Sequence, residues 1–171
     1  LCGVGNNNCF FFPHFFSFFH GIGRGLCVRL AREGASGITL VDVWKAAAGG
    51  TEAVATAASP SGCTTIVVVA DVADGRALEA AFETHVQQFG TLHACFNNAG
   101  VEERKDWRSV VDINLSAVIH GTRLAVHAMT STGSASPSSA SSTTAIVNIA
   151  SAVEGWHSFH NVILQVQPKA R

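Results

Sequence analysis

The sequence has no tyrosine at any of its 171 positions. A chain without tyrosine has no phenol to offer, although a phenol is one of the few side chains that act as general acid or base in enzymes. Methionine and proline are also scarce, with one Met and four Pro. Hydrophobic residues nevertheless make up 47% of the chain and charged residues 13%. This balance is typical of one globular domain with a sizeable core and excludes a disordered chain.

The sequence also has no excess of positive charge. It contains 11 Lys+Arg against 12 Asp+Glu, which gives a formal net charge of −1. This balance argues against a nucleic-acid or anionic-membrane binder that relies on broad positive charge. The five cysteines, at positions 2, 9, 27, 63 and 95, form no CxxC pair and are odd in number. We therefore expect reduced thiols and a cytoplasmic location rather than a disulfide framework.

Three segments differ in composition from the rest of the chain. Residues 1–20 contain the run FFFPHFFSFF, which is too short to span a bilayer and follows no basic region, so a secretory signal is disfavoured. Residues 130–144 are a Ser/Thr/Ala/Gly/Pro tract typical of a flexible insertion. Residues 153–171 form a tail. The domain proper is therefore expected at residues 21–152.

Strand and helix patterns alternate within this domain. Short apolar runs predict strands over 37–43, 64–70, 92–96 and 145–150, and the run 64–70 is the clearest candidate for a buried strand. Apolar spacing predicts a helix with Ile22, Leu26 and Leu30 on its core face, a second over 45–58, and a third from Asp74 to Gly90. A long helix over 106–129 presents one apolar face, formed by Leu115, Val118, Ile119, Thr122, Val126 and Met129.

This alternation predicts βαβ crossovers and hence an α/β fold with a Rossmann-like, doubly wound parallel sheet. We expect the sheet to be incomplete at both ends. Its central first strand would have to come from the Phe-rich run, which Pro13 interrupts. At the other end, the strand over 145–150 is expected to lie at or near an edge.

A glycine turn and an acidic residue suggest a nucleotide site. Gly21, Ile22 and Gly23 open the first helix, and Asp42 ends the next strand. Backbone N–H groups at such a helix start can bind a pyrophosphate. An acidic residue about 20 positions further on can accept both ribose hydroxyls and repels a 2′-phosphate. The alternative is an ordinary Gly-rich turn followed by an aspartate at a strand end.

The surrounding motifs resemble those of the short-chain dehydrogenase/reductase family. GIGRGLCVRLAREGA, VDV, ADVAD, FNNAG, DINL, HGT and IVNIAS follow in that family's order and approximate spacing over residues 21–152, apart from the Ser-rich tract. FNNAG and the helix that contains INL and HGT are the specific signals. The run NNAGVEERKDWRSVVDINL is similar to the NAD-dependent hydroxyprostaglandin dehydrogenase branch.

The resemblance implies a role for each matching residue in an NAD(P)-binding domain. It places the pyrophosphate at Gly21, Ile22 and Gly23, the adenosine ribose at Asp42, and the adenine at Asp71 and Val72. Asn98, Ala99 and Gly100 would pass beneath the cofactor. Asn114 would support a water in a proton relay, and Ser151 would hydrogen-bond the reacting oxygen of the substrate. The implied reaction is hydride transfer between NAD and a secondary alcohol or ketone.

The sequence departs from the family pattern at both ends. The resemblance places a catalytic Tyr at position 164 and a Lys at position 168, where this chain has Leu164 and Pro168, with Lys169 one place late. Phe16 and Ser17 stand where the family has Thr-Gly. Two interpretations therefore remain: an NAD-dependent oxidoreductase, or a catalytically inactive nucleotide-binding relic or mis-read gene fragment.

Other classes of function are disfavoured. The eight His have no Cys or carboxylate cluster beside them, so no metal site is expected. A GxSxG elbow is missing from the sequence, which argues against a Ser-His-Asp hydrolase. The expected partner is a small alcohol or ketone rather than nucleic acid or membrane. A homo-oligomer, formed through the helix over 106–129, is implied by the family resemblance alone.

Overall fold

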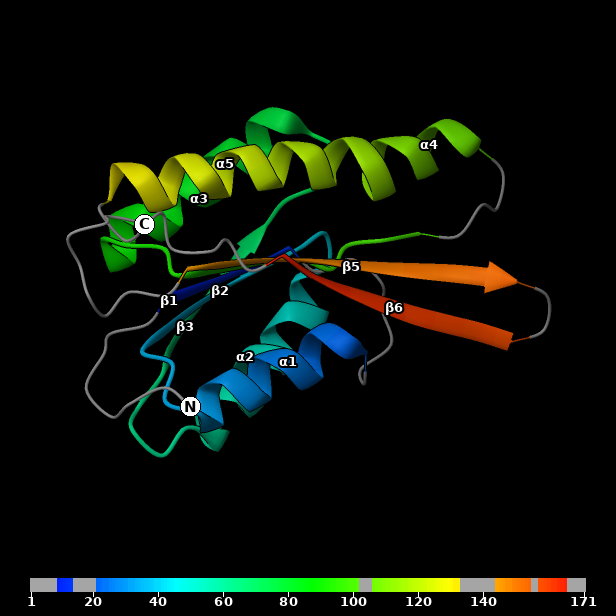
Figure 1. Cartoon of the computed structure of the whole chain (residues 1–171). Helices are drawn as coiled ribbons and strands as arrows, with labels where there is room; N and C mark the ends of the chain where they lie inside the picture. Colours follow the sequence, from blue (N-terminus) through cyan, green and yellow to red (C-terminus); the bar gives the residue numbers. More distant parts are fainter. Residues whose placement is uncertain (1–8, 14–20, 102–105, 133–143, 155–156, 166–171) are drawn as a thin grey trace, which may run out of the picture.

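The computed structural model describes residues 9–13, 21–101, 106–132, 144–154 and 157–165. Its centre is a six-stranded sheet in the order β3-β2-β1-β4-β5-β6 (Figure 1). The strands are β1 (Cys9–Pro13), β2 (Gly37–Asp42), β3 (Thr64–Val69), β4 (Ala94–Asn97), β5 (Ala145–Glu154) and β6 (His157–Gln165). All neighbouring strands run parallel except β5 and β6.

Helices cover both faces of this sheet. Figure 1 shows α1 (Ile22–Arg32) and α2 (Lys45–Ala58) on one face and α3 (Gly75–Phe89), α4 (Trp107–Val111) and α5 (Ala117–Ser131) on the other. A π-helical turn, Asp112–Ser116, joins α4 to α5. The strand order reverses between β1 and β4, so the chain changes faces there. This arrangement confirms the doubly wound α/β class.

The Phe-rich run supplies the central strand. Cys9–Pro13 pairs with β2 on one side, and its residues Phe10 and Phe11 pair with β4 on the other. Pro13 is the last residue of β1, opposite Val41. A proline at a strand end disturbs the ladder less than one in the middle, which reconciles it with a central position. Phe16 and Ser17, the departures from the family pattern, lie outside the described residues, as do positions 133–143 of the Ser-rich tract.

The strand predicted over residues 145–150, expected at or near an edge, lies one strand from the edge of the sheet. β5 continues to Glu154 and pairs antiparallel with β6, from Ile146 opposite Gln165 to Glu154 opposite His157. The tail therefore adds a strand to the sheet. Because this last strand is antiparallel, no crossover helix is needed between β5 and β6.

The strand predicted to be deeply buried is instead an edge strand. β3 forms where expected, but Thr64 and Val69 are exposed and its middle residues are half-buried. Every residue of its neighbour β2 is buried. The run TTIVVV has the composition of a central strand, whereas its place at the edge follows from the strand order.

In two helices, only some of the large apolar residues predicted to face the core do so. In α1, the buried residues are Gly23, Cys27 and Ala31; Leu26 and Leu30 are half-buried and pack against the core, while Ile22 is exposed. In α5, the buried side is formed by Ala117, Gly121, Ala125, Ala128 and Met129. Leu115, Ile119 and Val126, predicted to face the core, are exposed. Small residues let these helices lie close to the sheet.

Helix α3 forms as predicted and adds a buried polar group. The Asp74 carboxylate accepts from the N–H groups of Arg76 and Ala77, and Gly90 ends the helix with a φ of +74°. His85 is fully buried on its inner side. Its Nε2 lies 3.0 Å from the carbonyl oxygen of Thr91, which can only accept, so Nε2–H is the donor. Nδ1 then accepts from the hydroxyl of Thr39, 2.7 Å away on β2.

We expect His85 to make the fold acid-sensitive below neutral pH. Burial lowers its pKa from 6.5 to about 4, because the charged ring is poorly solvated. The unfolded chain therefore binds a proton that the folded chain does not, and stability is full above pH 6.5 and falls as the pH drops towards 4. The expected slope approaches about 1.4 kcal/mol per pH unit. Urea unfolding between pH 7 and 5 measures it, and a His85→Leu variant with the same slope would contradict this assignment.

Candidate functional site

The predicted phosphate turn lies at the start of α1, after the central strand. Gly21 is the N-cap residue, and its carbonyl accepts from the N–H of Gly25 at 3.2 Å. No side chain caps this end among the described residues, and the first turn holds no acidic residue. The first N–H groups of a helix have no partner within it and attract anions. Gly23 is buried in the α1 interface, where the helix packs closely on the sheet.

Asp42 stands at the end of β2, at the edge of the sheet where α1 begins. Its carboxylate is held in place by the N–H of Trp44, which donates to Oδ1 at 2.8 Å. The residue is only 6% exposed. A buried carboxylate is costly unless hydrogen bonds compensate it, so a structure keeps one where its charge has a use. Asp42 is therefore fixed at the carboxyl edge of the sheet, the edge at which doubly wound folds bind ligands.

Asp71 and Val72 follow β3 at the same edge but differ in access. Asp71 is exposed, and its Oδ1 accepts from the N–H of Ala73 at 2.9 Å. The Val72 side chain is buried in the core cluster that also contains Leu78 and Ala99. Only the backbone of Val72 is thus suited to contact a ligand.

Asn98, Ala99 and Gly100 follow β4, and the next residue, Val101, is hydrogen-bonded to Asn114. Asn114, in the π-helical turn, accepts from the N–H of Val101 through Oδ1 and donates to the carbonyl of Val101 through Nδ2, both at 2.8 Å. The turn replaces regular α-helix at this point, and such turns are frequent at functional sites. The Asn114 amide keeps one donor and one acceptor position beyond this pair, which suits the proposed contact with a water.

A buried polar network that the sequence analysis missed lies beneath this loop. Asn97 Nδ2 donates to Asn148 Oδ1 at 2.7 Å and to Thr122 Oγ1 at 3.2 Å. These three residues come from β4, α5 and β5. Asparagine is disfavoured inside strands, so Asn148 within the strand predicted over 145–150 and Asn97 directly after the one predicted over 92–96 were the available signal. The network ties the end of β4 to the middle of β5, and Ser151 follows Asn148 three positions further along β5.

Ser151 lies on the part of β5 that extends past β4. The last pair with β4 is Asn97 opposite Asn148, and Ser151 is opposite His160 of β6. Leu164, at the position where the family has Tyr, is opposite Val147. Leu164 is four positions along β6 from His160, the partner of Ser151. Four positions along a strand correspond to about 13 Å. The described strands therefore do not bring position 164 to Ser151.

The described residues contain no metal cluster, and two of their buried thiols are held in the protonated form. No group of three or more His, Cys, Asp or Glu among them could hold a metal ion. Burial raises the pKa of the Cys27 and Cys95 thiols, so both stay protonated and unreactive. No helix in the described part of the chain is long and apolar enough to cross a membrane.

Comparison with known proteins shows where this arrangement recurs. A family model described as short chain dehydrogenase matches residues 18–163. The 15-hydroxyprostaglandin dehydrogenase [NAD(+)] of Homo sapiens is 38% identical over 109 residues, which cover 64% of this chain and 40% of that protein. Levodione reductase of Leifsonia aquatica is 33% identical over 123 residues, 67% of this chain and 45% of that protein.

Solved structures give the same result for the fold. A levodione reductase structure aligns with a TM-score of 0.69 and 28% identity, over 83% of this chain and 53% of that one. Carveol dehydrogenase from Mycobacterium avium in complex with NAD aligns with a TM-score of 0.63 and 26% identity, over 74% and 50%. The chain thus spans less than half the length of the curated relatives that it matches. Because the family model matches residues 18–163, which are most of this chain, the chain belongs to the short-chain dehydrogenase family.

Proposed function

We propose that residues 21–152 form an NAD-binding unit of an oxidoreductase that transfers a hydride between NAD and a secondary alcohol or ketone. The observation that carries this proposal is the buried carboxylate of Asp42, held at the carboxyl edge of the sheet beside the glycine start of α1. The names of two relatives support it, since one is NAD(+)-dependent and another was solved with NAD.

The residues at this edge fit such a cofactor in kind and order. The N–H groups of Gly21, Ile22 and Gly23 would bind the pyrophosphate, and Asp42 would accept from the adenosine ribose hydroxyls. Asp71 and the backbone of Val72 would hold the adenine, and Asn98, Ala99 and Gly100 would lie beneath the nicotinamide half. When bound, NAD supplies the hydride acceptor or donor.

On the reaction side, the chain offers hydrogen bonds but no phenol. Ser151 would bind the substrate oxygen, and Asn114, fixed by Val101, would hold a water near it. With no Tyr in the sequence, these residues alone cannot protonate or deprotonate that oxygen as the family does. The absence favours a second candidate function, nucleotide binding without turnover.

Cofactor preference tests the proposal. A carboxylate within hydrogen-bond range of the ribose repels a 2′-phosphate by more than about 1.4 kcal/mol, which corresponds to tenfold in affinity. We expect the chain to bind NADH at least about tenfold more tightly than NADPH, and Asp42→Ala to bring the two affinities together. Fluorescence titration of both reduced cofactors measures this.

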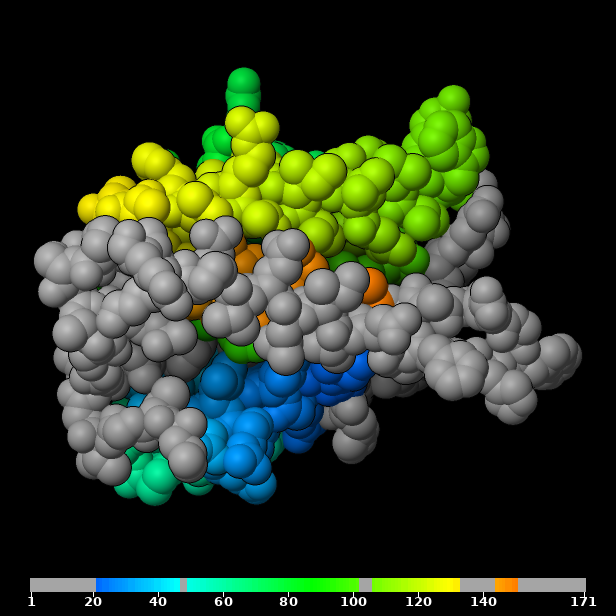
Figure 2. Space-filling model, in the orientation of Figure 1, coloured from blue at the N-terminus to red at the C-terminus, as the bar shows by residue number. Residues whose placement is uncertain are grey.

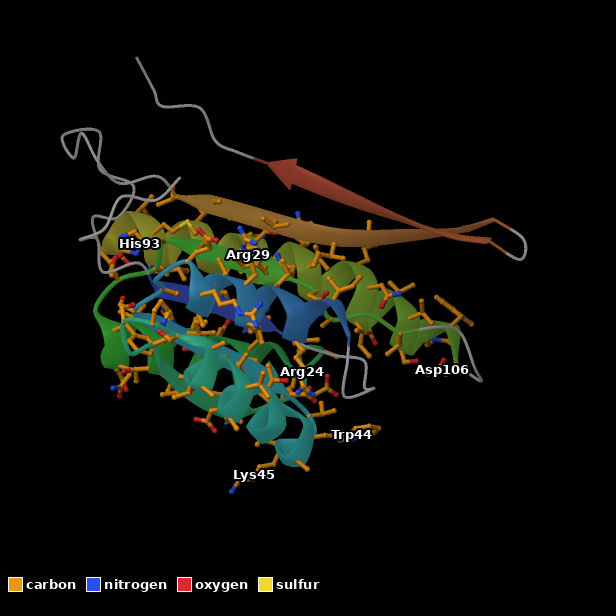
Figure 3. All side chains as sticks on the ribbon, turned by 90° about the horizontal axis from the view of Figure 1, so that it is seen from below. Arg24, Arg29, Trp44, Lys45, His93 and Asp106 are labelled. Carbon is orange, nitrogen blue, oxygen red and sulfur yellow. The ribbon has the colours of Figure 1, made fainter. Side chains whose placement is uncertain are left out.

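A matched carboxylate provides the control. Asp106 Oδ1 accepts from the N–H of Arg108 at 3.0 Å, two positions on, as Asp42 does from Trp44. Asp106 lies at the start of α4, away from α1 and α2 (Figure 3). Asp106→Ala should therefore keep the preference. Equal affinities for NADH and NADPH in the native chain, or no binding of either, would reject the assignment.

We also propose that a second copy of the chain covers the outer side of α5. Four large apolar residues of α4, the π-helical turn and α5 are exposed: Val111, Leu115, Ile119 and Val126. Figure 2 shows that α4 and α5 form one surface of the molecule. Exposed apolar surface of this kind marks protein contacts. Sedimentation should give a dimer that Leu115→Asp shifts to monomer, and a native monomer at all concentrations would contradict it.

A cytoplasmic location is the proposed compartment. Cys27, Cys63 and Cys95 form no disulfide bond, and all three are buried. Reduced thiols suit a reducing compartment. Treatment of the chain with oxidised glutathione, followed by mass measurement, should leave these three thiols unmodified in the folded state.

A further inference from the structure

Trp44 is an exposed indole at the edge where the proposed cofactor site lies. It is 59% exposed and forms the N-cap of α2, yet its side chain makes no capping hydrogen bond. Large apolar side chains gain free energy by burial, so an exposed indole at a candidate site points to a contact with something else. Figure 3 shows Trp44 projecting from the start of α2, at the same end of the molecule as Arg24 in the first turn of α1.

The bond from its N–H to Asp42 fixes the main chain of Trp44 next to the carboxylate. Because the Trp44 N–H donates to Asp42 Oδ1 at 2.8 Å, the carboxylate and the indole follow one another in a single tight turn. Val69, at the end of β3, is directly opposite Asp42 and is 54% exposed. Two exposed apolar residues thus neighbour Asp42: Trp44 two positions further along the chain and Val69 opposite it on the next strand.

This combination suits a planar base attached to a ribose. An indole binds a flat aromatic ring through its face, and a carboxylate beside it accepts from vicinal hydroxyls. We infer that Trp44 stacks on the adenine ring of the dinucleotide while Asp42 binds the ribose of the same nucleotide. The inference rests on the proposed function. It adds a residue that neither the motif nor the glycine turn identified.

A second exposed tryptophan gives a matched control. Trp107 is 55% exposed and starts α4, where the Arg108 guanidinium carbon lies 4.6 Å from the centre of its ring. It is as large and as accessible as Trp44 but stands at a different helix start. A general effect of removing a surface indole should appear equally in Trp44→Ala and Trp107→Ala.

The test compares binding of NADH, AMP and nicotinamide mononucleotide by calorimetry. Stacking on an aromatic side chain contributes about fivefold or more in affinity for each base. Trp44→Ala should weaken the binding of NADH and of AMP by about this factor. The affinity for nicotinamide mononucleotide, which has no adenine, should not change. Trp44→Phe should restore part of the loss, and Trp107→Ala should bind all three as the native chain does.

Two other outcomes are distinguishable. If the native chain binds NADH and Trp44→Ala binds it equally well with an unchanged melting temperature, the stacking inference is wrong and the proposed function stands. If the native chain binds no NADH, the proposed function itself fails. Equal losses in Trp44→Ala and Trp107→Ala would also overturn the specific role of Trp44.

Discussion

The purified 171-residue chain is expected to bind NADH but to oxidise secondary alcohols at least about 100-fold more slowly than a relative that carries the family's Tyr and Lys. Positioned acid–base groups contribute about 10²- to 10⁴-fold to rate, and the sequence has no Tyr. The measurement is NADH production across a panel of secondary alcohols, with cofactor binding checked in the same sample so that unfolded protein is not scored as inactive.

Restoring the two residues by sequence position should not restore the rate. Leu164→Tyr with Pro168→Lys puts a phenol at position 164, but Leu164 is opposite Val147, whereas Ser151 is opposite His160. The phenol would therefore lie about four strand positions from the partner of Ser151, too far for a shared hydrogen bond. Turnover by the native chain at the relative's rate would contradict the first expectation, and a strongly active double variant would contradict the second.

The second large effect is expected from Gly121→Ala. A Cβ at this position would lie 2.6 Å from Asn97 Oδ1, closer than side chains approach each other. Asn97 is buried and cannot move without losing its bonds to Asn148 and Thr122. Overpacking and broken buried hydrogen bonds together should lower the free energy of unfolding by about 2–4 kcal/mol. Thermal unfolding measures this as a drop of about 5–15 °C.

Another helical glycine serves as the control. A Cβ at Gly50, inside α2, would meet no heavy atom within 4 Å. Gly50→Ala should therefore raise stability by about 0.5–1 kcal/mol through helix propensity alone. In Gly121→Ala combined with Asn97→Ala the clash is gone, so the combined loss should be smaller than the sum of the single losses. Equal and small effects of the two glycine changes would show that α5 is not in tight contact with β4.

Gly121 also explains why apolar spacing identified the buried side of α5 only in part. At Gly121 the helix passes so close to Asn97 that a side chain would clash, and the large residues Leu115 and Ile119 are exposed instead. Apolar spacing identifies a helix and its period, but it assigns large apolar side chains to the core in preference to small ones such as Gly and Ala. The same bias placed Ile22 rather than Gly23 on the inner side of α1.

Local sequence patterns were also not enough to predict which strands lie at the edge of the sheet. The alternation of strands and helices was enough for the doubly wound class, and Asp74 and Gly90 marked the ends of α3. The exposure of β3 depends on its place at the edge, which is decided by pairing between distant segments. β6 was not predicted because residues 157–165 were treated as a tail. Among site residues, Asn114 was predicted from the family resemblance, whereas its two hydrogen bonds to the backbone of Val101 follow from the fold and not from any local pattern.

The central claim is that NAD binds at the carboxyl edge of the sheet, and hydrogen–deuterium exchange with saturating NADH tests it most directly. The loops at that edge, residues 42–45, 71–74 and 98–101, should exchange more slowly when NADH is present. The loops that precede β3 and β4 at the opposite edge, residues 59–63 and 90–93, should not change. Slower exchange at 59–63 and 90–93, with no change at 42–45, 71–74 and 98–101, would contradict the account.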